Sequence, residues 1–190
     1  MYKLQITPQP DFTEAFEDIA QRLKLNLVKS YKMDTGGNKL YSECNIVEEC
    51  KDLHELNYRI ELLIRTAKQH NLSRFKISSE LNENYTTNTP YKIGATYYEA
   101  TVEVDITKFD KIANYIVYNN GLIVSKNQNT DKFTLTLRTP DLNEFKKKII
   151  SIIKDLKDYN IAYDKIVKEF CFLDDNIELD KNWRNNERFN

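Results

Sequence analysis

One helix signature occurs twice in the chain, 89 positions apart, and this repeat constrains the fold more than any other feature. Asp52 begins the first copy and Asp141 the second, and each is followed three residues later by a Glu, which is the spacing of a capping box. The apolar positions also align, Ile60 with Ile149 and Ile64 with Ile153. Any two amphipathic helices share apolar spacing, but the shared capping residues favour an internal duplication.

The elements around each copy follow the order βαββαβ. Alternating apolar residues predict strands, and apolar residues at helical spacing after Asp11, Asp52, Thr107 and Asp141 predict helices. The predicted strands are 2–6, 25–31, 40–47 and 75–78 in the first half and 97–106, 122–126, 133–137 and 161–172 in the second. This is the order of the ferredoxin-like fold, in which two helices cover one face of an antiparallel sheet. We therefore expect an α+β protein of two tandem ferredoxin-like halves, each an antiparallel sheet with helices on one face.

The composition changes between the two halves. Residues 79–95 are polar and aperiodic, which is typical of a linker. We predict a first half over 1–78, a second half over 96–173 and a C-terminal tail over 174–190, which holds the only tryptophan, Trp183.

Charge and cysteine content restrict the class of protein. The 190 residues include 28 basic and 29 acidic side chains, a balance that makes nucleic-acid binding unlikely. Three cysteines and an N-terminus that reads as a strand are typical of a reduced, cytoplasmic protein. No apolar run reaches the roughly 20 residues of a membrane span, so no membrane partner is expected. The abundance of Lys, Asn and Ile suggests AT-rich coding, and we expect a bacterial source.

Motifs for catalysis and metal binding are missing from the sequence. The two-histidine phosphoesterases repeat a His-x-Thr or His-x-Ser motif, whereas His54 precedes Glu-Leu and His70 precedes Asn-Leu. The histidines and cysteines lack zinc-site spacing, so we predict no metal and no cofactor. The leading prediction is a small non-enzymatic binding or interaction protein whose partner is a protein or a small anionic ligand. The oligomeric state stays open.

The most unusual polar set lies on two predicted strands of the second half. Glu99, Thr101 and Glu103 share one side of the first strand, and Thr134, Thr136 and Arg138 share one side of the third. In a ferredoxin-like sheet these strands are neighbours, so the two sets can meet on the open face. Carboxylates beside an arginine can form a site for an anionic ligand. The alternative is an ordinary solvent-exposed face, which is polar by default.

This pattern resembles the Glu-x-Glu strands of the tunnel-fold triphosphatases. That family needs several inward Lys and Arg residues, and the predicted face has one, Arg138. The polar set itself gives the alternative function, an enzyme or sensor that acts on a phosphorylated or anionic small molecule at the open face.

A second alternative is RNA binding through exposed aromatic residues. Strand periodicity places Tyr98 and Phe133 on the helix-covered face and leaves Tyr97 on the open face. The same alternation places Cys44 on the inward side of its strand, where we expect a buried, unreactive thiol.

Overall fold

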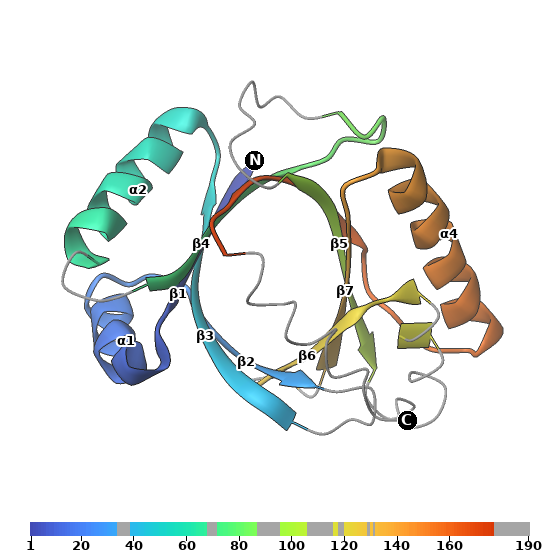
Figure 1. Cartoon of the computed structure of the whole chain (residues 1–190), viewed down its shortest axis with the longest axis horizontal. Coiled ribbons are helices and arrows are strands. Elements are labelled where there is room, and N and C mark those ends of the chain that lie inside the picture. Colours follow the sequence, from blue (N-terminus) through green and yellow to red (C-terminus); the bar gives the residue numbers. More distant parts are fainter. Residues whose placement is uncertain are drawn as a thin grey trace. The chain divides into compact units, whose positions relative to one another are not determined.

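The computed structural model of the chain describes residues 1–33, 39–67, 72–86, 96–105, 116–117, 120–128, 130 and 132–176. Its strands are β1 (Tyr2–Pro8), β2 (Leu27–Met33), β3 (Lys39–Cys50), β4 (Leu72–Glu80), β5 (Tyr97–Asp105), β6 (Ile123–Asn127), β7 (Lys132–Thr139) and β8 (Val167–Asp174). Its helices are the 3-10 helix η1 (Pro10–Phe12) and the α-helices α1 (Thr13–Arg22), α2 (Leu53–Ala67) and α4 (Leu142–Asp158) (Figure 1).

Hydrogen bonds join these strands in the order β1-β3-β2-β6-β7-β5-β8-β4, a closed antiparallel barrel in which β1 also pairs with β4. The prediction of two tandem ferredoxin-like sheets is therefore wrong, because β2 pairs with β6 and β8 with β4. The physical reason lies at the sheet edges. An edge strand exposes unpaired N–H and C=O groups, and closure pairs them.

The described residues divide into two compact units, and each unit takes strands from both halves of the sequence. Unit 1 holds the residues between Met1 and Val28, those between Cys44 and Thr96, and those from Phe170 onward. Unit 2 holds the residues between Lys29 and Glu43 and those between Tyr97 and Glu169.

In unit 1, β1 lies between β3 and β4, and helices α1 and α2 lie on one side of these strands (Figure 1). Leu4 and Ile6 of β1 and Ile46 of β3 are buried on the helix-covered face, and Phe16 and Leu63 are buried residues of the helices. The alternate residues of β1 are polar, so the sheet has one apolar and one polar face.

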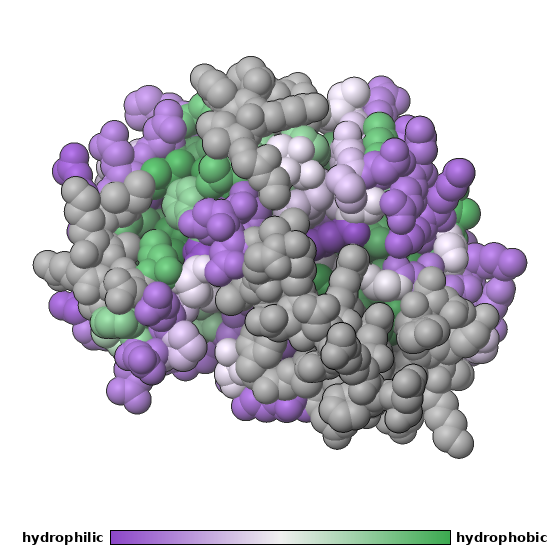
Figure 2. Space-filling model, in the orientation of Figure 1, coloured by the Kyte–Doolittle hydropathy of each residue, from purple (hydrophilic) through white to green (hydrophobic). Residues whose placement is uncertain are grey.

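In unit 2, β7 lies between β5 and β6, and β2 pairs with the other side of β6. Helix α4 packs on β5 and β7, where Ile149 and Ile152 face apolar strand residues, namely Ala100, Val102, Leu135 and Leu137. The outer side of α4 is mainly hydrophilic (Figure 2). Both faces of α4 follow the periodicity of the sequence.

The starts of α2 and α4 confirm the predicted capping residues. Asp52 accepts a hydrogen bond from the Glu55 amide at 2.8 Å, and Asp141 accepts one from the Glu144 amide at 2.7 Å. The helix expected from Asp11 begins instead at Thr13, because Asp11 lies in η1.

Some predictions fall on residues outside the described part of the chain. They concern the residues following Thr107, most of the proposed linker, His70, and the tail that contains Trp183. None of the helices in the part that is described is long and apolar enough to cross a membrane.

Candidate functional site

The six residues predicted as a site lie on one face of β5 and β7 in unit 2. The strand register pairs Glu99 with Arg138, Thr101 with Thr136 and Glu103 with Thr134. In an antiparallel pair, residues directly opposite each other project from the same face of the sheet. The structure thus brings all six together, on the face opposite α4.

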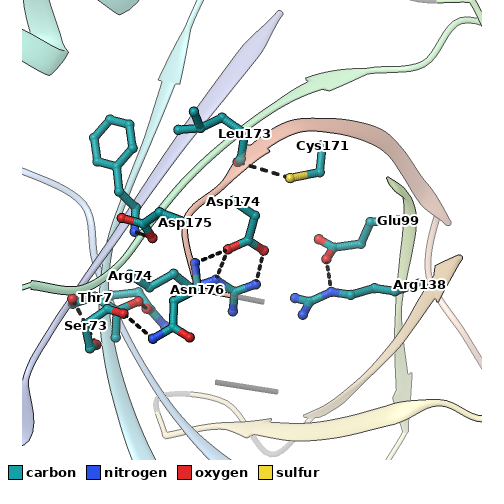
Figure 3. A network of polar contacts seen from close by, with 12 residues as sticks. Thr7, Ser73, Arg74, Glu99, Arg138, Cys171, Leu173, Asp174, Asp175 and Asn176 are labelled. Carbon is teal, nitrogen blue, oxygen red and sulfur yellow. Dashed lines mark hydrogen bonds and ion pairs between the residues drawn. The ribbon is translucent and has the colours of Figure 1, made fainter. Parts of the chain in front are cut away.

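Arg138 and Glu99 form the closest contact of this set. The Arg138 Nε donates a hydrogen bond to Glu99 Oε2 at 2.5 Å, as Figure 3 shows. The Arg138 Cζ lies 5.3 Å from the centre of the Tyr97 ring, so an aromatic face and a carboxylate hold the guanidinium.

The pair is enclosed rather than open to water. The side chain of Arg138 is 13% exposed and that of Glu99 is 4% exposed. Thr136 is also buried, at 8%. The expectation of an open, solvent-exposed face is therefore wrong at this end of the strands. A pair in water would contribute about 0–1 kcal/mol, whereas removing one partner of an enclosed pair leaves a buried charge.

The other end of the face is open. The side chain of Glu103 is 45% exposed, and its carboxylate lies 3.9 Å from Lys132 Nζ. Lys132 also forms an ion pair with Asp164, and the hydrogen bond to Asp164 raises the pKa of Lys132 above its usual value. Along β5, the face thus changes from an enclosed ion pair at Glu99 to an exposed ion-pair cluster at Glu103.

Sequence analysis missed a second cation on this face. Lys32 of β2 pairs in register with Ser125 of β6, and Ser125 pairs with Thr134 of β7. Registered residues therefore form one row across the four strands β2, β6, β7 and β5, from Lys32 to Glu103. The side chain of Lys32 is 11% exposed, and its Nζ lies 3.3 Å from Glu43 Oε2.

No sequence signal pointed to Lys32, because it comes from the first half of the chain. It joins the face only through the pairing of β2 with β6, which local periodicity does not encode. With Lys32 and Arg138, the face carries two enclosed cations and two enclosed carboxylates, Glu43 and Glu99.

The face holds hydrogen-bond donors of the kinds that anionic groups use, and each of its two enclosed cations is paired with a carboxylate. An arginine fork and a lysine ammonium both donate to phosphate or carboxylate oxygens, and threonine hydroxyls can add neutral hydrogen bonds. Enclosure by protein strengthens such interactions relative to water. Across the described residues, no group of three His, Cys, Asp or Glu side chains could hold a metal ion.

The aromatic residues lie as strand periodicity predicted. Tyr98 contacts Phe145 of α4, with ring centres 5.5 Å apart, so it lies on the helix-covered face. Tyr97 is on the opposite face but only 3% exposed, and its ring packs with Arg138. In this position Tyr97 does not present a ring to solvent for base stacking.

Comparison with known proteins gives distant likenesses. No protein family and no curated protein matches the chain. One similar solved structure is a proposed monooxygenase from Lactobacillus acidophilus NCFM, with 9% identity and a TM-score of 0.32, covering 92% of this chain and 93% of that chain. Another is a mutant of chlorite dismutase from Candidatus Nitrospira defluvii, with 10% identity and a TM-score of 0.32, covering 97% of this chain and 94% of that chain.

Both similar structures carry the names of enzymes, so the prediction of a non-enzymatic binding or interaction protein is wrong and is not retained. At this identity and TM-score, neither name assigns a reaction or a substrate to this chain.

Proposed function

We propose that the protein is an enzyme or sensor that acts on a phosphorylated or otherwise anionic small molecule, bound on the polar face of unit 2. Arg138 is the principal anchor, because its guanidinium can make two-point contact with an oxyanion. Glu99 and Tyr97 hold that guanidinium in place. Thr101, Glu103, Thr134 and Thr136 complete the face, and Lys32 adds a second cation.

The observation that carries the proposal is the enclosed Glu99–Arg138 pair on a face that also holds Lys32. Burying ion pairs is costly, and replacing them by apolar residues is often neutral or stabilising. Enclosed charges that do not serve stability are typical of sites that bind or transform a charged ligand.

A thermal-shift titration tests the proposal with orthophosphate, pyrophosphate and citrate at constant ionic strength. A ligand that binds only the native state raises the melting temperature with its concentration. We expect a rise with at least one phosphate probe, and we expect the double variant Glu99→Gln/Arg138→Gln to lose it. The double variant removes both charges together, so no uncompensated buried charge is left behind.

Lys126→Gln is the matched control. Lys126 belongs to the same sheet, but its Nζ lies 5.9 Å from the ring of Phe133, on the helix-covered face. It should respond to the probes like the wild type. The proposal fails when none of the three anions shifts the wild type, or when the double variant responds as strongly. Release of orthophosphate from pyrophosphate would identify the protein as an enzyme rather than a sensor.

A further inference from the structure

We propose that Asn120 is a modification site, whose side-chain amide is shielded in the native turn before β6 and becomes a carboxylate once that turn opens. The new carboxylate then opposes re-formation of the turn, so the conversion is a one-way record of local unfolding. The site uses none of the residues assigned to the polar face of unit 2, so it goes beyond the function proposed above.

The turn has the geometry of a Schellman helix end. The Leu122 N–H donates to the Val117 carbonyl oxygen at 3.0 Å, which is the bond from C″ to C3 in that motif. Gly121 takes the C′ position with a φ of +62°, in the left-handed region that glycine adopts without strain. The fold therefore needs a glycine directly after Asn120.

The side chain of Asn120 is held by two acceptors. Its Nδ2 donates to the Ile116 carbonyl oxygen at 3.0 Å and to Asp155 Oδ2 at 3.0 Å. Both partners accept hydrogen bonds, so the place fits an amide nitrogen and not an oxygen. Asn120 is only 3% exposed, and the two bonds satisfy a donor that would otherwise be buried without partners.

Apolar residues keep this turn closed. Ile116 and Leu122 are 0% exposed, and Val117 is 1% exposed. Opening the turn brings these side chains into water, which costs free energy. In the native protein the Asn120 amide therefore stays on its two acceptors.

An asparagine followed by glycine can lose its side-chain amide without a catalyst. The Gly121 backbone nitrogen attacks Asn120 Cγ, the new N–C bond forms, and the Cγ–Nδ2 bond breaks. The Gly121 N–H proton leaves with Nδ2 as ammonia. Water then adds to one carbonyl of the cyclic imide, which restores the backbone N–H and leaves a carboxylate. Glycine has no Cβ to hinder the attacking nitrogen, so the open turn is a favourable place for this reaction.

A carboxylate at position 120 does not fit the native turn. It would face the Asp155 carboxylate and the Ile116 carbonyl oxygen, which are acceptors like itself. Like charges at hydrogen-bonding distance repel, and a buried acceptor without a donor costs free energy. The turn leads directly into β6, which pairs with β2 and β7, so its loss weakens the sheet that carries Lys32.

Peptide mass spectrometry of the full wild-type chain tests the conversion. One sample is kept in mildly alkaline buffer and a second in the same buffer with urea, and conversion at position 120 is followed in both. We expect the native sample to convert at least about tenfold more slowly, a factor that corresponds to about 1.4 kcal/mol of opening free energy. Equal rates would overturn the proposal, because the native turn would then give no shielding.

Gly121→Ala is the matched control for the attacking nitrogen. A Cβ at position 121 would meet no atom of the described residues within 4 Å, so only the φ of +62° opposes the change. The added methyl group hinders the nitrogen, and in urea this variant should convert at position 120 more slowly than the wild type. Conversion at the wild-type rate would rule out the cyclic imide and overturn the proposed step.

Refolding shows whether the conversion is one-way. Wild-type chains from the urea sample are refolded, and size-exclusion chromatography separates the native fraction from the rest. Converted chains should be enriched in the non-native fraction. Equal proportions of converted chains in both fractions would overturn the one-way character of the site.

Variants test the product directly. Asn120→Asp should lower the melting temperature by about 5 °C or more, because it sets a buried carboxylate against Asp155. Asn120→Ala removes the same hydrogen bonds without adding a charge and should lower it less. Asn120→Asp/Asp155→Asn should be more stable than Asn120→Asp alone, since the amide at position 155 donates to the new carboxylate. Wild-type stability of Asn120→Asp, or no rescue by the second substitution, would overturn the proposal.

Discussion

Arg74 and Asp174 lie 100 positions apart in the sequence and form a two-point ion pair in unit 1 (Figure 3). Arg74 Nε donates to Asp174 Oδ1 at 3.0 Å, and Nη2 donates to Oδ2 at 2.5 Å. The two side chains are 1% and 0% exposed. The pair joins β4 to the end of β8, so a contact across the two halves of the sequence lies within one compact unit.

Breaking this pair should destabilise the protein strongly. Arg74→Met leaves the Asp174 carboxylate buried without its partner, and the expected loss is about 3–5 kcal/mol in the free energy of unfolding. Urea denaturation with an unchanged m-value measures it.

The control for this prediction is an exposed pair of the same kind. Arg22 and Asp18 contact each other at 2.5 Å, but their side chains are 68% and 61% exposed. Arg22→Met should therefore cost less than about 1 kcal/mol. A double variant, Arg74→Met/Asp174→Leu, should be more stable than Arg74→Met alone, because it removes the orphaned charge. Equal losses in the buried and the exposed variant would contradict the argument.

The N-cap of α4 should be worth a measurable part of the stability. Asp141 accepts the Glu144 amide at 2.7 Å, and Asp141→Ala should cost about 1 kcal/mol by losing that bond. Asp141→Asn keeps an acceptor at the same place and should retain most of the stability. Thermal denaturation of the two variants compares them directly, and the prediction does not survive an Asn variant as unstable as the Ala variant.

The stability of the protein should depend on pH through Asp52. The hydrogen bond from the Glu55 amide lowers the pKa of Asp52 below its ordinary value of 3.8. A carboxyl with a lowered folded pKa stabilises the native state above its unfolded pKa, and this contribution disappears as the pH falls through the folded pKa. The loss should therefore occur below about pH 4.

Asp52→Asn serves as the comparison, since the amide caps the helix at every pH. Unfolding curves recorded between pH 2 and pH 6 should show a smaller pH dependence for the variant than for the wild type. An NMR titration of the Asp52 carboxyl carbon gives the pKa itself. A midpoint above 3.8 would refute the prediction.

The three thiols should resist alkylation in the native protein. Cys44, Cys50 and Cys171 are all buried, and burial with the nearby Glu55 raises the pKa of Cys50 above its usual value. A raised pKa lowers the thiolate fraction that reacts. Mass spectrometry after iodoacetamide treatment should find the three sites unmodified natively and fully modified in urea. Rapid labelling of Cys44 in the native protein would contradict its assignment to the inward side of β3.

The sequence determined the features that depend on neighbours along the chain. The Asp-x-x-Glu spacing located the starts of α2 and α4, because capping is a bond within one turn of helix. Alternation determined which side of β5 and β7 carries Glu99 and Arg138, and the registered pair confirms that these residues meet. The burial of Cys44 also follows from alternation and is confirmed.

Tertiary structure alone decided how the strands at the sheet edges pair and which residues become enclosed. Lys32 reaches the polar face of unit 2 through β6, and Asp174 reaches Arg74 through the pairing of β8 with β4. Edge pairing uses backbone N–H and C=O groups, which every residue type except proline supplies, so a local pattern cannot specify the partner strand. The enclosure of Glu99 and Arg138 follows from packing of the whole chain, and for that reason periodicity predicted their face but not their burial.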